Sequence, residues 1–295
     1  MGEVRVAIAG VGNSASSLVQ GIAHYANGGA NDPVGLMYWD LGGYRPKDLR
    51  VVAAWDVDTR KVQHDVADAI FAKPNSTARF AHAVPPTGTL LEMGAALDGI
   101  APHMEDWPED RRFVVADAQQ STLGEVMDCL RARAADVLVK YLPVGSQAAS
   151  EYNAEAALAA RVALVNAIPV FVASDAGWGK RFVDTSVPVP GDDIKAHLGA
   201  TILRRTLTGL FARCGVKPER VYQINTAGNT DFLNMLARDR LARKKASKTE
   251  AVQSVCARRM DPDNIHLEPS DYVAWQNDNK VAFIRMEGLL FGARR

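Results

Sequence analysis

The residues with the clearest chemical signature are small residues close to the N-terminus. Gly10, Gly12 and Ala15 fit the pattern G-x-G-x-x-G/A, between an apolar run that predicts a strand and a pattern that predicts a helix. In such a unit the first glycine allows a tight turn, the second lets the backbone approach a pyrophosphate, and the third small residue permits close helix–strand packing. The helix N-terminus adds backbone N–H groups and partial positive charge, so we expect Asn13 and Ser14 to take part. The turn therefore predicts a dinucleotide site.

An acidic residue normally follows such a turn by about 20 residues and binds the ribose. Here residues 24–48 form a long intervening segment, and the second strand ends only at Trp55-Asp56. We therefore assign the ribose to Asp56, whose carboxylate can accept hydrogen bonds from the hydroxyls and would repel a 2′-phosphate, which favours NAD over NADP. The alternative is a strand, turn and helix whose glycines serve backbone geometry alone.

The elements that must position this turn alternate between strands and helices over residues 1–190. Strands are expected at residues 49–58, 112–117, 136–145 and 162–170, and helices at 59–72 and 122–135. This alternation predicts an α/β fold, a Rossmann-type doubly wound parallel sheet that forms the NAD-binding domain. Residues 73–111 are rich in Pro, His and Thr, and we expect loop there.

Residues 191–295 have a different character and predict a second, α+β domain, to which the resemblance described below assigns catalysis and oligomerisation. A long helix is expected over 191–215, and a strand over 280–288. Between them, the basic run 238–252 contains Lys244 and Lys248, which are four residues apart and would share one face of a helix. Such a run is usually a solvated basic face.

The composition excludes several classes of protein. Lys and Arg together number 34, as do Asp and Glu, so the charge favours neither nucleic acid nor an anionic membrane as a partner. No apolar run approaches the ~20 residues of a membrane span. The early first strand leaves no room for a signal peptide, and the three dispersed cysteines indicate neither a disulfide framework nor a metal site. We therefore expect a cytoplasmic protein.

Several segments, in order along the chain, resemble the myo-inositol-phosphate synthase (inositol-3-phosphate synthase) family, most closely its short bacterial type. They are "YLPVGS" (141–146), "VNAIPVF" (165–171), "GDDIK" (191–195), "GNTDFLNM" (228–235), "KKASKT" (244–249), "PSDYVAW" (269–275) and "DNKVAFIRMEG" (278–288). The opening "GVGNSASSLVQG" and the later "WDVD" are similar to that family as well, so the resemblance covers essentially the whole chain.

This resemblance implies an NAD-dependent isomerase that acts on a hexose 6-phosphate. In the family, NAD oxidises C5 of glucose 6-phosphate, the new ketone acidifies C6, and a base removes a C6 proton. The enolate attacks C1 in an intramolecular aldol step, and the same NADH reduces the ring ketone. NAD is thus recycled within each turnover, and no motif indicates a divalent or monovalent cation.

The resemblance also implies roles for particular lysines. The family's catalytic lysines correspond to Lys244, Lys248 and Lys280. Lys244 would transfer the proton at the oxidised carbon, while Lys248 and Lys280 would hold the phosphate and the developing alkoxide or enolate. Such chemistry requires cations near developing oxyanions and groups that move protons, and lysine can serve both needs.

Other site residues follow from the same resemblance. Asp193 would contact the nicotinamide carboxamide, and Asn229 and Asp231 would lie along the substrate cavity. Taken alone, Asp193 could cap a helix and the other two could shape an Asn/Gly turn. Lys195 and His197 belong to a loop that helps to bind substrate phosphate in the family, although a lone histidine is more often structural.

Two features depart from the family pattern. Ala196 stands where close relatives have serine, so one hydroxyl donor is lost and the imidazole of His197 is gained next to it. Relatives also continue for several dozen residues beyond the motif that ends at Gly288, whereas this sequence ends at Arg295. We therefore expect a C-terminally truncated member with a more open cofactor pocket and one catalytic lysine fewer.

Three functions stay open. The first is conversion of glucose 6-phosphate to myo-inositol phosphate. The second is the same chemistry on fructose 6-phosphate, which would close a five-membered cyclitol phosphate suited to carbocyclic natural products. The third is a non-catalytic NAD-binding subunit that pairs with a full-length relative. The resemblance also implies a homo-oligomer, a tetramer, formed through the second domain.

Overall fold

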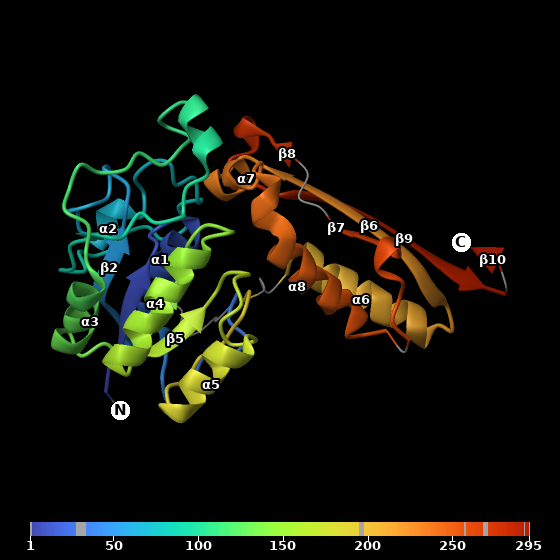
Figure 1. The fold of residues 1–295 in the computed structure, drawn as a ribbon, viewed down its shortest axis with the longest axis horizontal. Helices are drawn as coiled ribbons and strands as arrows, with labels where there is room; N and C mark the ends of the chain where they lie inside the picture. The colour runs from blue at the N-terminus through green and yellow to red at the C-terminus, as the bar shows by residue number, and fades with distance from the viewer. Residues whose placement is uncertain are drawn as a thin grey trace. The chain divides into compact units, whose positions relative to one another are not determined.

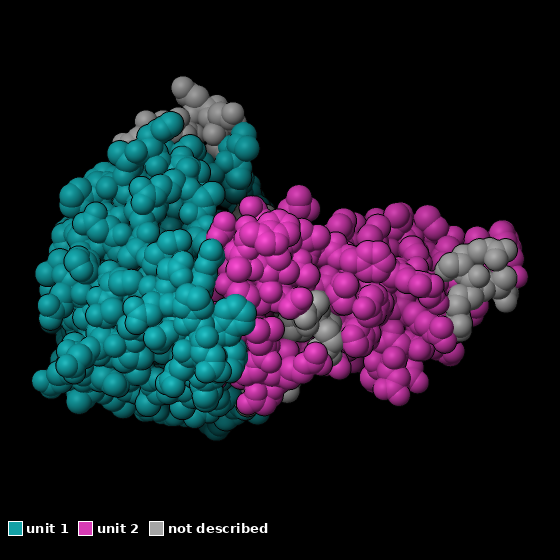
Figure 2. All heavy atoms as spheres, turned by 90° about the horizontal axis from the view of Figure 1, so that it is seen from above, with its two compact units in different colours: residues 1–192 teal, residues 193–295 magenta. Residues whose placement is uncertain are grey.

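The computed structural model describes residues 2–294 except 28–33, 195–197, 257, 268–270 and 292, and for 242–244 and 293–294 it describes the backbone alone. The chain forms two compact units, residues 1–192 and 193–295 (Figure 2). The boundary that the sequence predicts after residue 190 falls just before this division. Figure 1 labels the helices of both units and those strands for which there is room.

The first unit is built on a parallel five-stranded sheet. Its strands are β1 (Val4–Ala9), β2 (Leu49–Asp56), β3 (Glu92–Met93), β4 (Val137–Lys140) and β5 (Ala163–Asn166), in the order β3-β2-β1-β4-β5. The direction of winding reverses between β1 and β4, which is the switch point where doubly wound sheets bind their ligands. The predicted α/β, Rossmann-type fold is confirmed.

Helices cover both faces of this sheet. They are α1 (Asn13–Asn27) and α2 (Val66–Ala69) on one face and α3 (Leu123–Ala132), α4 (Gln147–Ala160) and α5 (Ala176–Asp184) on the other. Successive side chains of a strand point to opposite faces. In β1, Val6 and Ile8 therefore pack with α1 and α2, while Ala7 and Ala9 pack with α3, α4 and α5. Side chains of β1 thus contribute to the hydrophobic cores on both faces of the sheet.

Three local predictions in this unit are wrong. The run 112–117 is extended but belongs to no named strand, and β3 lies instead within the segment predicted as loop. The run pairs beyond the end of β2, since the Thr59 amide donates to Val114 O and the Ala116 amide donates to Val57 O. The helix predicted over 59–72 contains only the short α2, which begins after Asp65 because that carboxylate caps the Ala67 amide.

The second unit contains a mixed sheet. Its strands are β6 (Lys217–Ala227), β7 (Ile265–Leu267), β8 (Asp271–Tyr272), β9 (Val281–Leu290) and β10 (Ala293–Arg294), in the order β10-β9-β6-β7 with β8 also on β6. Helices α6 (Ala200–Arg213) and α8 (Ala242–Gln253) lie side by side along this sheet (Figure 1), and α7 (Thr230–Asn234) follows β6. The predicted helix over 191–215 is shorter than expected, because α6 begins at Ala200 after Gly199.

Short 3-10 turns complete the chain at Pro46–Asp48, Pro102–Asp106, Arg238–Leu241, Pro262–Asn264 and Ala274–Gln276. In the described ranges, none of the helices has the length and apolar character needed to cross a membrane.

Candidate cofactor and active site

The glycine turn after β1 has one closed side and one open side. Gly10 has φ +89°, and a Cβ at this position would lie 2.8 Å from the carbonyl oxygen of Tyr141, directly after β4. A side chain is excluded there by both backbone conformation and space. At Gly12, in contrast, no neighbouring atom lies within 4 Å of an added Cβ. The turn is therefore packed against β4 at Gly10 and leaves room for a ligand at Gly12, where α1 begins.

A cavity of about 100 Å³ lies in the first unit at the carboxyl ends of the strands. Gly10, Gly12 and Asp56 line it together with loop residues after β3 and side chains of α3 and α4. Most of its wall is apolar, and Phe113 and Trp55 contribute aromatic rings. The indole N–H of Trp55 is buried and has no acceptor among the described residues. Apolar and aromatic walls with a few polar groups suit a purine nucleoside.

The Asp56 carboxylate is engaged by the backbone around it. Oδ1 accepts from the amides of Val57 at 2.8 Å and Asp58 at 3.0 Å, and Oδ2 accepts from the Val11 amide at 2.8 Å. Lys61 Nζ lies 3.6 Å from Oδ2, and the Asp56 side chain is only 8% exposed. A carboxylate oxygen offers about two lone-pair sites. Oδ1 is therefore satisfied, whereas Oδ2 keeps capacity for a ribose hydroxyl.

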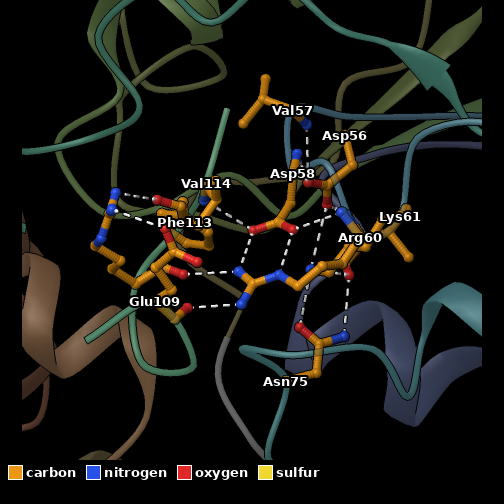
Figure 3. A network of polar contacts seen from close by, with 11 residues as sticks. Asp56, Val57, Asp58, Arg60, Lys61, Asn75, Glu109, Phe113 and Val114 are labelled. Carbon is orange, nitrogen blue, oxygen red and sulfur yellow. Dashed lines mark hydrogen bonds and ion pairs between the residues drawn. The ribbon is translucent and has the colours of Figure 1, made fainter. Parts of the chain in front are cut away.

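A second acid–base pair, Asp58 and Arg60, holds the segment that contributes Phe113 to the cavity wall. Arg60 donates to the buried Asp58 carboxylate from Nε at 2.7 Å and from Nη2 at 2.6 Å (Figure 3). The same guanidinium donates to the carbonyls of Glu109 at 2.6 Å and Arg112 at 2.8 Å, and Asp58 also accepts from the Val114 amide. These bonds fix the segment that carries Phe113. They also engage the guanidinium of Arg60, the first arginine after Asp56 in the chain.

Lys140 is a buried cation at the end of β4 that the sequence analysis did not single out. Its Nζ has no hydrogen-bond partner in the part of the chain that the structure describes, and burial lowers its pKa to about 7. The neighbouring Asn166 donates to Asp192, which also accepts from the amides of Val172 and Ser174. Asp192 thus holds the loop after β5, and its charge partly offsets the effect of burial on Lys140.

The second unit holds part of the predicted active site around α8. Lys248 is buried, and its backbone carbonyl accepts from Arg204 Nη2 at 3.2 Å. Arg204 on α6 is also fully buried and donates to Gln223 on β6, and burial lowers its pKa to about 10. Ser247 Oγ donates to Asp193 Oδ2 at 2.5 Å. The structure therefore connects Asp193 to the predicted lysine helix.

The Asn/Gly turn forms the other described part of this site. Asn229 accepts from the Phe232 amide at 3.0 Å and so caps α7, and its Nδ2 donates to Asp278 at 2.7 Å. Asp231 lies in the first turn of α7. Lys280 Nζ lies 6.0 Å from the centroid of the Phe232 ring. Asn229 thus has a structural role in the turn, and its amide also links α7 to the segment before β9.

The remaining predicted residues are placed as follows. Asn13 and Ser14 form the start of α1, and Ser14 is exposed there. Lys195, His197 and the side chain of Lys244 lie outside the described residues. Within the described ranges, no cluster of three or more His, Cys, Asp or Glu side chains is arranged to hold a metal ion.

This fold and these residues define a class: an α/β protein with a dinucleotide turn and a second unit that carries a basic helix. A family model described as myo-inositol-1-phosphate synthase matches residues 199–295. The inositol-3-phosphate synthase of Mycolicibacterium smegmatis is 49% identical over 296 residues, which is 99% of this chain and 79% of the relative. The inositol-3-phosphate synthase of Corynebacterium glutamicum is 45% identical over 295 residues, which is 98% of this chain and 79% of the relative. The chain belongs to the inositol-3-phosphate synthase family, and it is an enzyme of that type.

Solved structures share this fold. The crystal structure of Ari2 has a TM-score of 0.75 and 31% identity, and the match covers 99% of this chain and 79% of Ari2. A myo-inositol-1-phosphate synthase-related protein from Thermotoga maritima has a TM-score of 0.79 at 22% identity, over 99% of this chain and 80% of that protein. The second likeness shows the fold alone.

Proposed function

We propose that the protein cyclises a hexose 6-phosphate to a cyclitol phosphate by an intramolecular aldol reaction with NAD as a recycled cofactor. Glucose 6-phosphate is the proposed substrate and myo-inositol phosphate the proposed product. The observation that carries this proposal is the 49% identity to an inositol-3-phosphate synthase over 99% of the chain. Proteins named in this way form inositol phosphate, and the family resemblance supplies the sequence of steps.

The glycine turn and Asp56 support the choice of cofactor. Gly10, Gly12, Asn13 and Ser14 would hold the pyrophosphate, and the open side at Gly12 provides the space for it. Asp56 Oδ2 would accept from the ribose. The two cations that follow Asp56 are already engaged, Arg60 by Asp58 and Lys61 by the turn itself, which favours NAD over NADP. NAD, when bound, would accept a hydride from the sugar and return it to the ring.

The second unit would supply the groups that act on the sugar. Lys244 is proposed to move the proton at the oxidised carbon, and Lys248 and Lys280 to stabilise negative charge that develops on oxygen. Asp193, which accepts from Ser247, is proposed to hold the nicotinamide carboxamide. The proposed substrate-binding residues are Lys195, His197, Asn229 and Asp231.

Fructose 6-phosphate is the second candidate substrate, and Ala196 is the feature that favours it. The loss of a serine hydroxyl from a segment that helps to bind substrate phosphate in the family would change how a hexose phosphate is held. After oxidation at C5, C6 of fructose 6-phosphate could attack the C2 ketone and close a five-membered ring. A purely non-catalytic subunit is disfavoured, since such a protein has no need of Lys244, Lys248 and Lys280.

Product analysis separates these candidates. The purified protein is incubated with NAD and either glucose 6-phosphate or fructose 6-phosphate, and the ring size of any product is determined by NMR. We expect a six-membered cyclitol phosphate from glucose 6-phosphate. A five-membered product from fructose 6-phosphate alone would establish the second candidate, and no product from either sugar would favour the non-catalytic subunit.

We also propose that the protein is a homo-oligomer, a tetramer, formed through the second sheet. Buried and exposed residues alternate along β6, and the face opposite Val221 carries Tyr222, which is paired in register with β9. On that face Val281 is 57% and Phe283 56% exposed. Exposed apolar sheet faces of this kind commonly mark protein interfaces. Light scattering that gave only a monomer of about 31.9 kDa at micromolar concentration would contradict this proposal.

A further inference from the structure

The peptide groups on both sides of Val11 are held by side chains that the glycine pattern does not include. The Val11 amide donates to Asp56 at 2.8 Å. The Val11 carbonyl accepts from Lys61 Nζ at 2.9 Å and from Asn75 Nδ2 at 3.1 Å. Lys61 also donates to Asn75 Oδ1 at 3.0 Å, so the two side chains act as one unit (Figure 3).

The planarity of the peptide gives these bonds a consequence for the ligand side of the turn. The carbonyl of Val11 and the amide N–H of Gly12 belong to one trans peptide group, in which they point in opposite directions. Lys61 and Asn75 hold the carbonyl on the protein side. The Gly12 N–H is therefore directed to the other side, and an added Cβ at Gly12 meets no atom within 4 Å.

The surroundings of Lys61 show that this arrangement is built into the fold. Lys61 is fully buried, and its charge lies 3.6 Å from Asp56 Oδ2. Asn75 is anchored in turn, because its Nδ2 also donates to the carbonyl of Ile70 at 3.0 Å. A buried ammonium is costly unless it is paired and hydrogen-bonded. Lys61 meets this requirement through Asp56, the Val11 carbonyl and Asn75.

The segment that follows Asn75 holds the next residue of the turn. The Ser76 amide donates to Asn13 Oδ1 at 2.9 Å, and Thr77 Oγ1 donates to the Asn13 carbonyl at 3.2 Å. Three consecutive residues, Asn75, Ser76 and Thr77, thus fix both the glycine turn and the first residue of α1. The side-chain oxygen of Asn13 is consequently engaged in holding Asn13 against this segment.

We propose that Lys61 and Asn75 are positioning residues for the pyrophosphate of the cofactor: they orient the Val11–Gly12 peptide so that its N–H meets the phosphate. This inference rests on the proposed NAD binding. It predicts that the two residues matter for ligands with a pyrophosphate and not for the nucleoside alone. A merely structural role would affect both kinds of ligand equally.

The test compares Lys61→Met and Asn75→Ala with the unaltered protein by titration calorimetry against adenosine, ADP and NAD. We expect the dissociation constants of ADP and NAD to rise about tenfold, the loss typical of a hydrogen bond to a charged group. The constant for adenosine should change by less than about twofold. Lys47→Met, the same substitution at an exposed lysine, is the matched control and should change none of them.

The outcomes separate this inference from the proposed function. If the unaltered protein binds neither ADP nor NAD, the cofactor proposal fails. If it binds them, the positioning role is wrong in either of two cases. In the first, both variants bind ADP as tightly as the unaltered protein does, and in the second, both lose affinity for adenosine and ADP in parallel. Thermal melting checks folding, and Asn75→Ala decides the matter if Lys61→Met does not fold, because it leaves the Lys61–Asp56 pair in place.

Discussion

Replacing Lys248 or Lys280 by alanine is expected to lower the rate of cyclisation by on the order of 10²-fold or more, while NAD binding stays nearly unchanged. The aldol step requires an enolate to be formed and its negative charge to be stabilised, and each substitution removes a cation proposed for that purpose. Hydride transfer alone has no such requirement. Initial rates of cyclitol phosphate formation, measured alongside calorimetry with NAD, test this expectation.

Lys245→Ala provides the matched control on the same helix. Lys245 is exposed and is separated from Lys248 by less than one helical turn, whereas Lys248 is buried. The control should keep a rate within about twofold of the unaltered protein, as is usual for surface substitutions. Equal rates for the control and the Lys248 variant would show that Lys248 takes no part in the reaction.

Replacing Asp56 by alanine is expected to abolish NAD binding and also to destabilise the first unit by about 3 kcal/mol. The substitution removes the acceptor of the Val11, Val57 and Asp58 amides and leaves the buried Lys61 without its anion. Urea denaturation measures the stability, and calorimetry measures the binding. NADP should bind no better than NAD to the variant, because Arg60 stays on Asp58.

Asp56→Asn distinguishes charge from hydrogen bonding at this position. It keeps an acceptor oxygen of the same shape and loses the negative charge, so we expect a smaller loss of stability than for alanine. An Asp56→Ala protein that melted and bound NAD like the unaltered protein would show that the acid neither supports the turn nor contacts the ribose. A variant that gained NADP binding would show that one of the nearby cations is available after all.

The sequence predicts those parts of the site that are local in the chain. The turn at Gly10 and Gly12 is recognisable because the strand, the turn and the helix start are adjacent, and each glycine has a separate geometric reason. Asp56 is recognisable because it ends an apolar strand. The parallel sheet follows from the repeated alternation of elements, which needs no knowledge of side-chain contacts.

The parts that could not be predicted depend on contacts between distant residues. Lys61 and Asn75 reach Val11 across 50 and 64 positions of the chain, and no spacing in the sequence indicates such a bond. For the role of Lys61, the sequence offers one signal alone, which is a cation shortly after the strand that ends at Asp56. The run around Val114 has the apolar character of a strand. Its backbone nevertheless pairs with residues beyond the end of β2, because the Val114 amide donates to the Asp58 carboxylate and the Val114 carbonyl accepts from the Thr59 amide.

The ratio of cyclitol phosphate to NADH is the measurement that tests the central claim most directly. The protein is incubated with excess glucose 6-phosphate and a substoichiometric amount of NAD, the product is quantified by NMR, and NADH is followed by its absorbance. If the hydride returns to the ring within each turnover, many molecules of carbocyclic phosphate form per NAD and no NADH accumulates. Accumulation of NADH in proportion to substrate, with no carbocycle from either glucose 6-phosphate or fructose 6-phosphate, would contradict the account.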